Sequence, residues 1–130
     1  MSRRLNVALA AAGLSVLTGL GCANTPTSPD LIVDPIQIEK VEVRVMESSP
    51  PQAAAHVEGI LGDGCSELHS QAQTRSGSTV TITLLRERPR DAVCSQIAKL
   101  YVADIPLEGQ YPPGRYVVRV NDVVKDFTTE

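Results

Sequence analysis

Aromatic residues are scarce in this chain: among its 130 residues there is no Trp, one Phe and three Tyr. Modules that bind sugars or nucleic-acid bases commonly use aromatic side chains as stacking platforms, so the shortage argues against such ligands. Basic residues are also in the minority, with 12 Lys and Arg against 15 Asp and Glu and a formal net charge of −3. A mildly acidic chain does not favour nucleic acid as a partner.

The sequence also lacks the motifs of catalytic and cofactor sites. There is no G-x-S-x-G motif, and the glycines occur at turns instead of in a phosphate-binding loop. His56 and His69 show no ligand spacing to a Cys or to Met46, and both are interpreted as solvated side chains. We therefore expect a protein that is not an enzyme and that holds no cofactor and no metal.

One short basic cluster interrupts the acidic background. Arg86, Arg88 and Arg90 alternate with Glu87 and precede Asp91. Because the acids are interleaved with the arginines, the cluster is interpreted as the solvated end of a strand.

Long apolar runs are confined to the N-terminus. Arg3 and Arg4 are the only charged residues before Asp30, residues 5–17 are mostly apolar, and residues 18–21 are mostly small. This order is typical of an export signal. A membrane-spanning helix is the alternative, but it needs roughly 20 apolar residues, and this run is shorter. The pattern predicts a signal peptide over residues 1–21.

The end of this segment, T-G-L-G-C over residues 18–22, resembles the lipobox of bacterial lipoproteins. Gly19 stands where that family usually has Leu, and Leu20 follows one position late. The resemblance implies that Cys22 is acylated and that the chain is cut just before it. The protein would then be exported and membrane-anchored on the extracytoplasmic side, at the outer membrane and periplasm or the cell surface. The alternative is ordinary secretion with cleavage near Gly21 or Ala23 and an unmodified thiol.

Only three cysteines are present, so assigning Cys22 to lipid leaves Cys65 and Cys94. An even pair in an exported domain predicts a disulfide. Closing a loop of about 30 residues in this way is worth roughly 3–4 kcal/mol in the chain-entropy account. A metal-binding or redox pair is the alternative, although no C-x-x-C spacing supports it.

Proline divides the mature chain into a linker and a domain. Residues 22–35 contain Pro26, Pro29 and Pro35, which favour extended backbone, and they are predicted to be a lipid-anchored linker. Residues 31–33 are apolar and could form an edge strand instead. The domain is predicted over residues 36–130.

Period-2 alternation of apolar and polar residues dominates the domain and predicts strands. Within the first strand the apolar parity switches at Lys40, which predicts a bulge or a change of sheet. Residues 91–99 are ambiguous between a helical turn and a loop. About seven strands are expected, as an antiparallel β-sandwich with a small barrel as the alternative. They cover residues 36–45, 53–61, 68–75, 78–86, 101–107, 116–120 and 123–128.

The stretch P-G-R-Y-V-V-R-V-N-D over residues 113–122 resembles the P-x-G-x-Y-x-V-x-V-N-G stretch near the end of bacterial immunoglobulin-like domains. G-D-G-C and R-P-R-D-A-V-C, at residues 62–65 and 88–94, are similar to segments of uncharacterised bacterial lipoproteins. The resemblance implies an all-β, immunoglobulin-like sandwich. It assigns structural turn roles to Gly114, Tyr116, Asn121 and Asp122, with the Tyr hydroxyl bonded back to the backbone. Asp122 replaces the usual Gly, so a looser hairpin is expected.

Loops at the ends of such sandwiches commonly bind partners. The candidates are residues 48–52, 62–67, 86–95 and 108–115. We expect a non-enzymatic interaction or envelope accessory module, with a membrane contact through its lipid and a protein partner at these loops. The alternative is a secreted peptidase inhibitor similar to the chagasin type. The N-P-T-T-G and R-P-W motifs of those inhibitors are missing, apart from the fragment at residues 88–90.

Overall fold

The computed structural model describes Gly21 and residues 30–130 and is built from strands. Apart from Gly21, the predicted signal segment lies outside the described residues, and so does Cys22. In the part of the chain that is described, no helix is long and apolar enough to cross a membrane. The eight strands are β1 (Leu31–Pro35), β2 (Gln37–Met46), β3 (Gln52–Gly62), β4 (Glu67–Ser76), β5 (Thr79–Pro89), β6 (Lys99–Pro106), β7 (Gly114–Val120) and β8 (Val123–Thr129).

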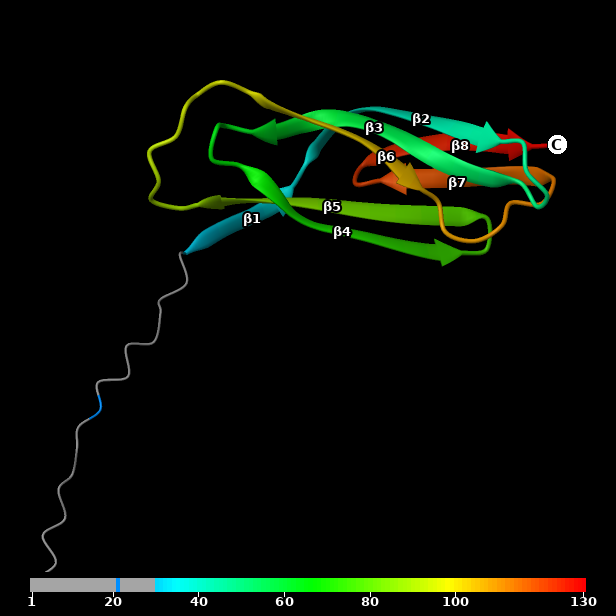
Figure 1. Cartoon of the computed structure of the whole chain (residues 1–130), viewed down its shortest axis with the longest axis horizontal. Helices are drawn as coiled ribbons and strands as arrows, with labels where there is room; N and C mark the ends of the chain where they lie inside the picture. The colour runs from blue at the N-terminus through cyan, green and yellow to red at the C-terminus, as the bar shows by residue number, and fades with distance from the viewer. Residues whose placement is uncertain (1–20, 22–29) are drawn as a thin grey trace, which may run out of the picture.

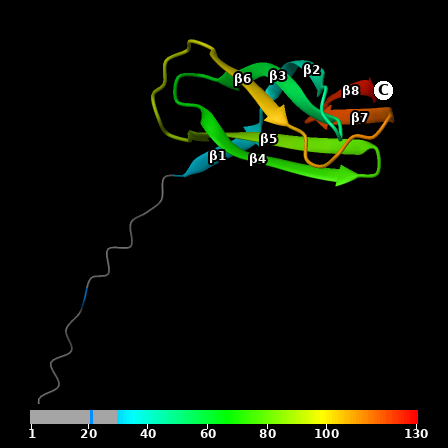
Figure 2. The ribbon, with the colours of Figure 1, turned by 45° about the vertical axis from the view of Figure 1, so that its right-hand side comes forward.

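The strands form two sheets packed face to face, as Figures 1 and 2 show. One sheet has three strands in the order β2-β3-β6. In the other, β4 pairs with one edge of β5, while β7 and β1 share the opposite edge, and β8 lies beyond β7. The predicted all-β sandwich is therefore confirmed, with eight strands in place of about seven.

Alternation along the strands builds the core between the sheets. Val80, Ile82 and Leu84 of β5 are fully buried, and Ala55 and Val57 of β3 face them from the other sheet. Aliphatic side chains provide most of this core, as the composition predicts. Of the four rings in the core, three gather near one end: Tyr111, Tyr116 and Phe127.

The domain begins before residue 36. Residues 31–35, predicted as linker, are strand β1, which pairs antiparallel with β5 from Leu31↔Pro89 to Pro35↔Leu85. This is the edge-strand alternative for residues 31–33. At Ile36 the chain crosses to the other sheet, and the register of β2 on β3 shifts between Ile38 and Lys40. The parity switch at Lys40 is therefore a β-bulge, and the change of sheet comes a few residues earlier.

One strand pair is parallel, against the expectation of an antiparallel sandwich. β5 and β7 run in the same direction, from Thr79↔Val117 to Ile82↔Val120. The reason is the path of the chain between them, since it returns through β6 in the opposite sheet. The two hairpins predicted within this sheet, β4–β5 and β7–β8, are both present.

The last hairpin has the predicted register, with Tyr116 opposite Phe127 and a two-residue turn at Asn121 and Asp122. Gly114 is the first residue of β7, and the Tyr116 hydroxyl donates to the Pro112 carbonyl oxygen at 2.6 Å. Among the described non-glycine residues, only Asn121 has a positive φ, at 50°. Asp122 therefore needs no left-handed backbone, and the reason for expecting a looser hairpin does not apply.

The Asn121 side chain also closes a gap in the large sheet. It lies where β7 and β1 both end along the edge of β5, after Val120↔Ile82 and Pro35↔Leu85, so neither strand pairs with Leu84. The amide nitrogen Nδ2 donates to the carbonyl oxygens of Ile36 and Leu84, at 2.8 and 3.0 Å, and Oδ1 accepts from Leu84 N at 2.9 Å. One side chain thus joins the end of β7 and the residue after β1 to the middle of β5.

Candidate interaction surfaces

The predicted binding loops separate into two groups at opposite ends of the sandwich (Figure 1). Residues 48–52 and 108–115 lie at one end, where Tyr111 N donates to Pro51 O at 3.1 Å. Residues 62–67 and 86–95 lie at the other, together with the start of β1. We call the second the disulfide end, because it carries Cys65 and Cys94. We call the first the distal end, because it lies opposite the point where the chain enters the domain.

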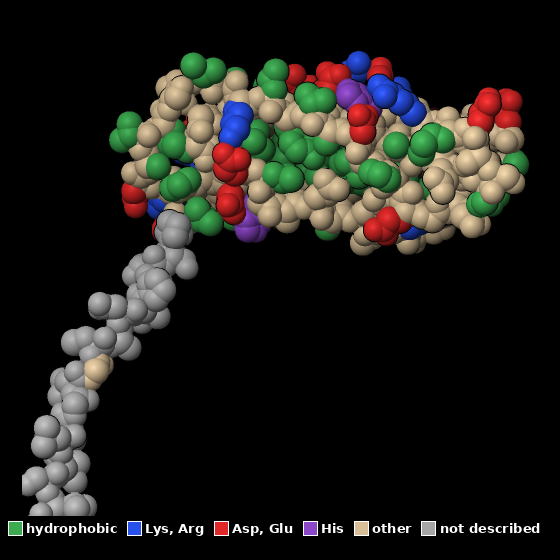
Figure 3. Space-filling model, viewed as in Figure 1, with side chains coloured by type: hydrophobic (Ala, Val, Ile, Leu, Met, Phe, Trp, Pro, Cys, Tyr) green, Lys and Arg blue, Asp and Glu red, His purple; other side chains and the backbone are tan. Residues whose placement is uncertain are grey.

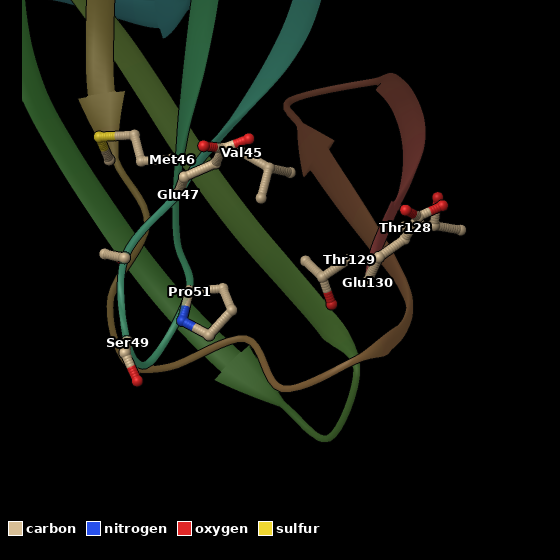
Figure 4. Close-up of a pocket in the computed structure, with 9 residues that line it drawn as sticks. Val45, Met46, Glu47, Ser49, Pro51, Thr128, Thr129 and Glu130 are labelled. Carbon is tan, nitrogen blue, oxygen red and sulfur yellow. The ribbon is translucent and has the colours of Figure 1, made fainter.

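A groove of about 680 Å³ opens at the distal end (Figure 4). The segment between β2 and β3 forms one wall, and the end of β8 forms the other. Apolar, hydroxyl-bearing and acidic residues share the lining, and most of them are exposed. The lining residues are Val45, Met46, Glu47, Ser48, Ser49, Pro51, Thr128, Thr129 and Glu130.

The distal end rests on the aromatic cluster of Tyr111, Tyr116 and Phe127. Tyr111 is fully buried, with its ring edge-on to Tyr116 at 5.1 Å between centroids. Phe127 stacks on Tyr116 at 5.3 Å. The carbonyl oxygen of Pro112 accepts from the hydroxyls of both Tyr116 and Thr129. The groove wall at β8 is therefore held to the loop before β7 by buried contacts.

Strand β4 supports the same end from the outside. The Arg75 guanidinium lies 4.4 Å above the Tyr111 ring centroid, a cation–π contact, and donates to Gln110 O at 2.7 Å. Gln73 bonds Pro106 O and Glu108 N. The sequence gives no signal for these roles, because β4 has the pattern of a weak polar strand and its hydrogen-bond partners at this end are 33 to 35 residues away.

At the disulfide end, Cys65 and Cys94 are bonded to each other, as predicted. Both sulfurs are used in this bond, so neither is available to a metal as a thiolate. Asp63 lies beside the pair and accepts from Cys65 N and Ser66 Oγ, both at 3.1 Å, while Arg88 Nη2 pairs with it at 3.0 Å. Asp63 therefore fixes the turn that carries Cys65.

The arginines predicted as a solvated strand end have specific partners. Arg90 Nε lies 2.7 Å from Asp30 Oδ2, and Arg86 donates to Leu61 O at 2.9 Å. Together with the Arg88–Asp63 pair, these contacts join β5 to the entry of the chain and to the end of β3. The interpretation as a solvated strand end holds for Arg90, which is 54% exposed, whereas Arg86 and Arg88 are 30% exposed and bond acceptors from distant segments.

His56 has two carboxylate partners on the outer face of the small sheet. Its Nδ1 lies 2.7 Å from Asp104 Oδ1 and its Nε2 lies 3.1 Å from Glu58 Oε1. The side chain is only 15% exposed, so it is not the solvated residue expected from the sequence. In Figure 3, charged side chains of both signs and a His gather over β2, β3 and β6. Arg44 and Lys40 complete this network.

The two carboxylates favour an imidazolium with both ring nitrogens protonated. Hydrogen bonds that the ring donates to the carboxylates of Asp104 and then Glu58 raise the pKa of His56 above its usual value of about 6.5. Because the folded-state pKa is raised, the protonated His56 stabilises the fold. This stabilisation is complete at pH values below the unfolded-state pKa and is lost as pH rises through the folded-state pKa.

The wild type should therefore have a higher thermal midpoint than a His56→Gln variant at low pH. The difference between the two midpoints should shrink as pH rises above about 6.5. The variant is the matched reference because it retains His69 and every carboxylate. An NMR titration of His56 should give a midpoint above about 6.5, and a midpoint at or below that value would contradict the ion-pair account.

The part of this chain that resembles known proteins is the β-sandwich. Residues 55–129, from within β3 to the last residue of β8, match the model of a family described as ORF11 beta-sandwich domain. A Herpetosiphon aurantiacus protein described as an uncharacterized 10.2 kDa protein in the HgiCIIM 5' region is 39% identical over 90 residues. That alignment covers 69% of this chain and 96% of the relative.

A second protein from the same organism, described as an uncharacterized 10.2 kDa protein in the HgiBIM 5' region, is 37% identical over 78 residues. The alignment covers 60% of this chain and 95% of that relative. No solved structure matches the chain.

Proposed function

The chain belongs to the ORF11 beta-sandwich domain family, and the names of its relatives state no activity. We therefore propose a function from the residues of this chain and their positions in the structure. The protein is a lipid-anchored extracytoplasmic module that is not an enzyme, and it binds a partner protein at its distal end. Cys22 is the site of acylation. The disulfide supports the export part of this proposal, because such bonds persist mainly in oxidising compartments.

The arrangement of the two ends supports a presenting role. The chain enters at Asp30, where Arg90 N donates to Asp30 O at 2.9 Å. The segments that line the groove, at the end of β2, the loop after it and the end of β8, lie at the opposite end (Figure 1). A lipid at Cys22 would hold the disulfide end toward the membrane and leave the distal end pointing into the surrounding space.

The observation that carries the partner proposal is the groove itself. Val45 and Met46 are 41% and 43% exposed and lie in a recess together with hydroxyls and acids. The aromatic cluster holds the loop before β7 and the end of β8, and Tyr111 N donates to Pro51 O, so little ordering of these segments is needed when a partner binds. Protein interfaces are commonly formed in this way, with apolar contacts inside a polar rim.

Val45→Arg should abolish capture of the partner, because it places a bulky charge in the groove. The measurement is recovery of proteins from envelope extract on immobilised mature protein. Val124→Arg is the matched control, since Val124 is 48% exposed on β8 but is not a groove residue. We expect one stoichiometric protein with the wild type and with Val124→Arg, and its loss with Val45→Arg.

Equal recovery with both variants would contradict binding in the groove. Inhibition of a papain-like protease by the purified domain would favour the peptidase-inhibitor alternative instead. The R-P fragment at residues 88–90 lies at the disulfide end, away from the loops at residues 48–52 and 108–115 (Figure 1).

A further inference from the structure

The loop between β5 and β6 presents apolar side chains to solvent at the disulfide end. Val93 is fully exposed, at 102% of its reference area, and Ile97 is 78% exposed. Leu100, at the start of β6, is 70% exposed. Figure 3 shows hydrophobic side chains standing out from this end. Single exposed apolar residues are ordinary, but three within eight consecutive positions indicate a surface that contacts another molecule or a membrane.

This loop is held in place. The disulfide joins Cys94, the residue after Val93, to Cys65 in the turn after β3. Gly64 N donates to Ser95 O at 2.9 Å and ties the next residue to the same turn. The exposed side chains are therefore presented on a braced loop.

The surface also lies beside the point where the chain enters the domain. Arg90, three residues before Val93, bonds Asp30 through both its backbone nitrogen and its guanidinium. Eight peptide steps separate Cys22 from Asp30, and even fully extended they span at most about 29 Å. A lipid on Cys22 would thus keep this loop within reach of the bilayer surface.

The charged side chains at the disulfide end are paired with each other, so a membrane contact there would be made by apolar side chains. Arg88 pairs with Asp63, Arg90 with Asp30, and Lys99 with Glu67, so the cations are balanced by neighbouring acids. Such an end offers little attraction to anionic headgroups and little repulsion from neutral ones. Aliphatic side chains can instead enter the boundary between headgroups and acyl chains.

We propose that Val93, Ile97 and Leu100 insert into the outer part of the bilayer that carries the Cys22 lipid. This inference rests on the proposed lipid anchor. The loop acts as a second, weaker membrane contact that orients the sandwich, with β1 at the membrane and the distal groove directed away from it.

The absence of Trp from the natural chain makes the test direct. Val93→Trp and, as a matched control at the distal end, Val45→Trp each introduce a single fluorophore at an exposed Val. Acylated full-length protein is reconstituted into phosphatidylcholine vesicles with or without bromine on the acyl chains. We expect bromine to quench the fluorescence of the Val93→Trp variant by about half or more, since interfacial side chains lie ~5–10 Å into the headgroup and acyl boundary. The fluorescence of the Val45→Trp variant should be unaffected.

Flotation of the same vesicles reports anchoring independently. If the Val93→Trp variant floats but is quenched no more than the Val45→Trp variant, this inference is overturned and the lipid anchor is left intact. Protein that does not float would contradict the proposed anchor and the inference with it. Quenching that persists in high salt supports the apolar mode, whereas loss of quenching in salt would overturn it.

Discussion

Asn121→Ala is expected to lower the free energy of unfolding by about 3 kcal/mol or more. The substitution removes the acceptor of Leu84 N and a donor to the carbonyl oxygen of Ile36. Leu84 is fully buried and Ile36 is 1% exposed, so water does not replace these bonds readily. Alanine must also adopt the positive φ that Asn tolerates. Urea unfolding of the purified domain measures the loss.

Two matched variants separate the causes. Asn121→Gly also removes the bonds but tolerates the positive φ, so its difference from Asn121→Ala isolates the backbone cost. Asp122→Ala alters an exposed side chain in the same turn and should change stability by no more than about 0.5 kcal/mol. An Asn121→Ala domain within about 1 kcal/mol of the wild type would contradict the bracing role, given the usual cost of orphaned buried groups.

Cys22→Ala should move the protein from the membrane fraction to the soluble exported fraction. Each buried CH₂ of an acyl chain contributes about 0.8 kcal/mol, and two chains hold a protein essentially permanently. Without them, the contact proposed for the β5–β6 loop is too small to retain the domain. Fractionation of cells followed by detection of the protein gives the result.

The double variant Cys65→Ala/Cys94→Ala is the control for this experiment. It removes the disulfide but leaves Cys22, so it should remain in the membrane fraction even if the domain is less stable. An unchanged membrane fraction for Cys22→Ala would contradict acylation, as would release of both variants.

Side-chain alternation made most of the fold predictable. Where one face of a strand is buried, apolar residues recur at every second position, as in Val80, Ile82 and Leu84. The disulfide followed from counting cysteines. The last hairpin register followed from the spacing between Tyr116 and Phe127 across a two-residue turn.

Pairing between strands that are distant in the sequence is harder to predict. β1 was assigned to the linker because a five-residue strand between prolines has little alternation of its own. The parallel pairing of β5 with β7 depends on β6 lying in the opposite sheet, which local patterns do not specify. Asn121 was recognised as a turn residue, but its bonds to Ile36 and Leu84 join positions 85 and 37 residues away.

The distal groove was predictable only in part. Residues 48–52 were selected as a loop that could bind a partner, and they form one wall. The opposite wall comes from Thr128 to Glu130, which in the sequence are simply the end of the last strand. Proximity of these segments arises from the packing of β2 beside β8 and has no local signature.

The intact mass of the native protein, extracted from its host membrane, reports cleavage, acylation and the disulfide in one measurement. We predict a chain that begins at Cys22, carries the mass of two or three acyl chains, and is two hydrogens lighter for the Cys65–Cys94 bond. A mass matching the uncleaved chain would contradict it, and so would a cleaved chain with an unmodified Cys22 thiol.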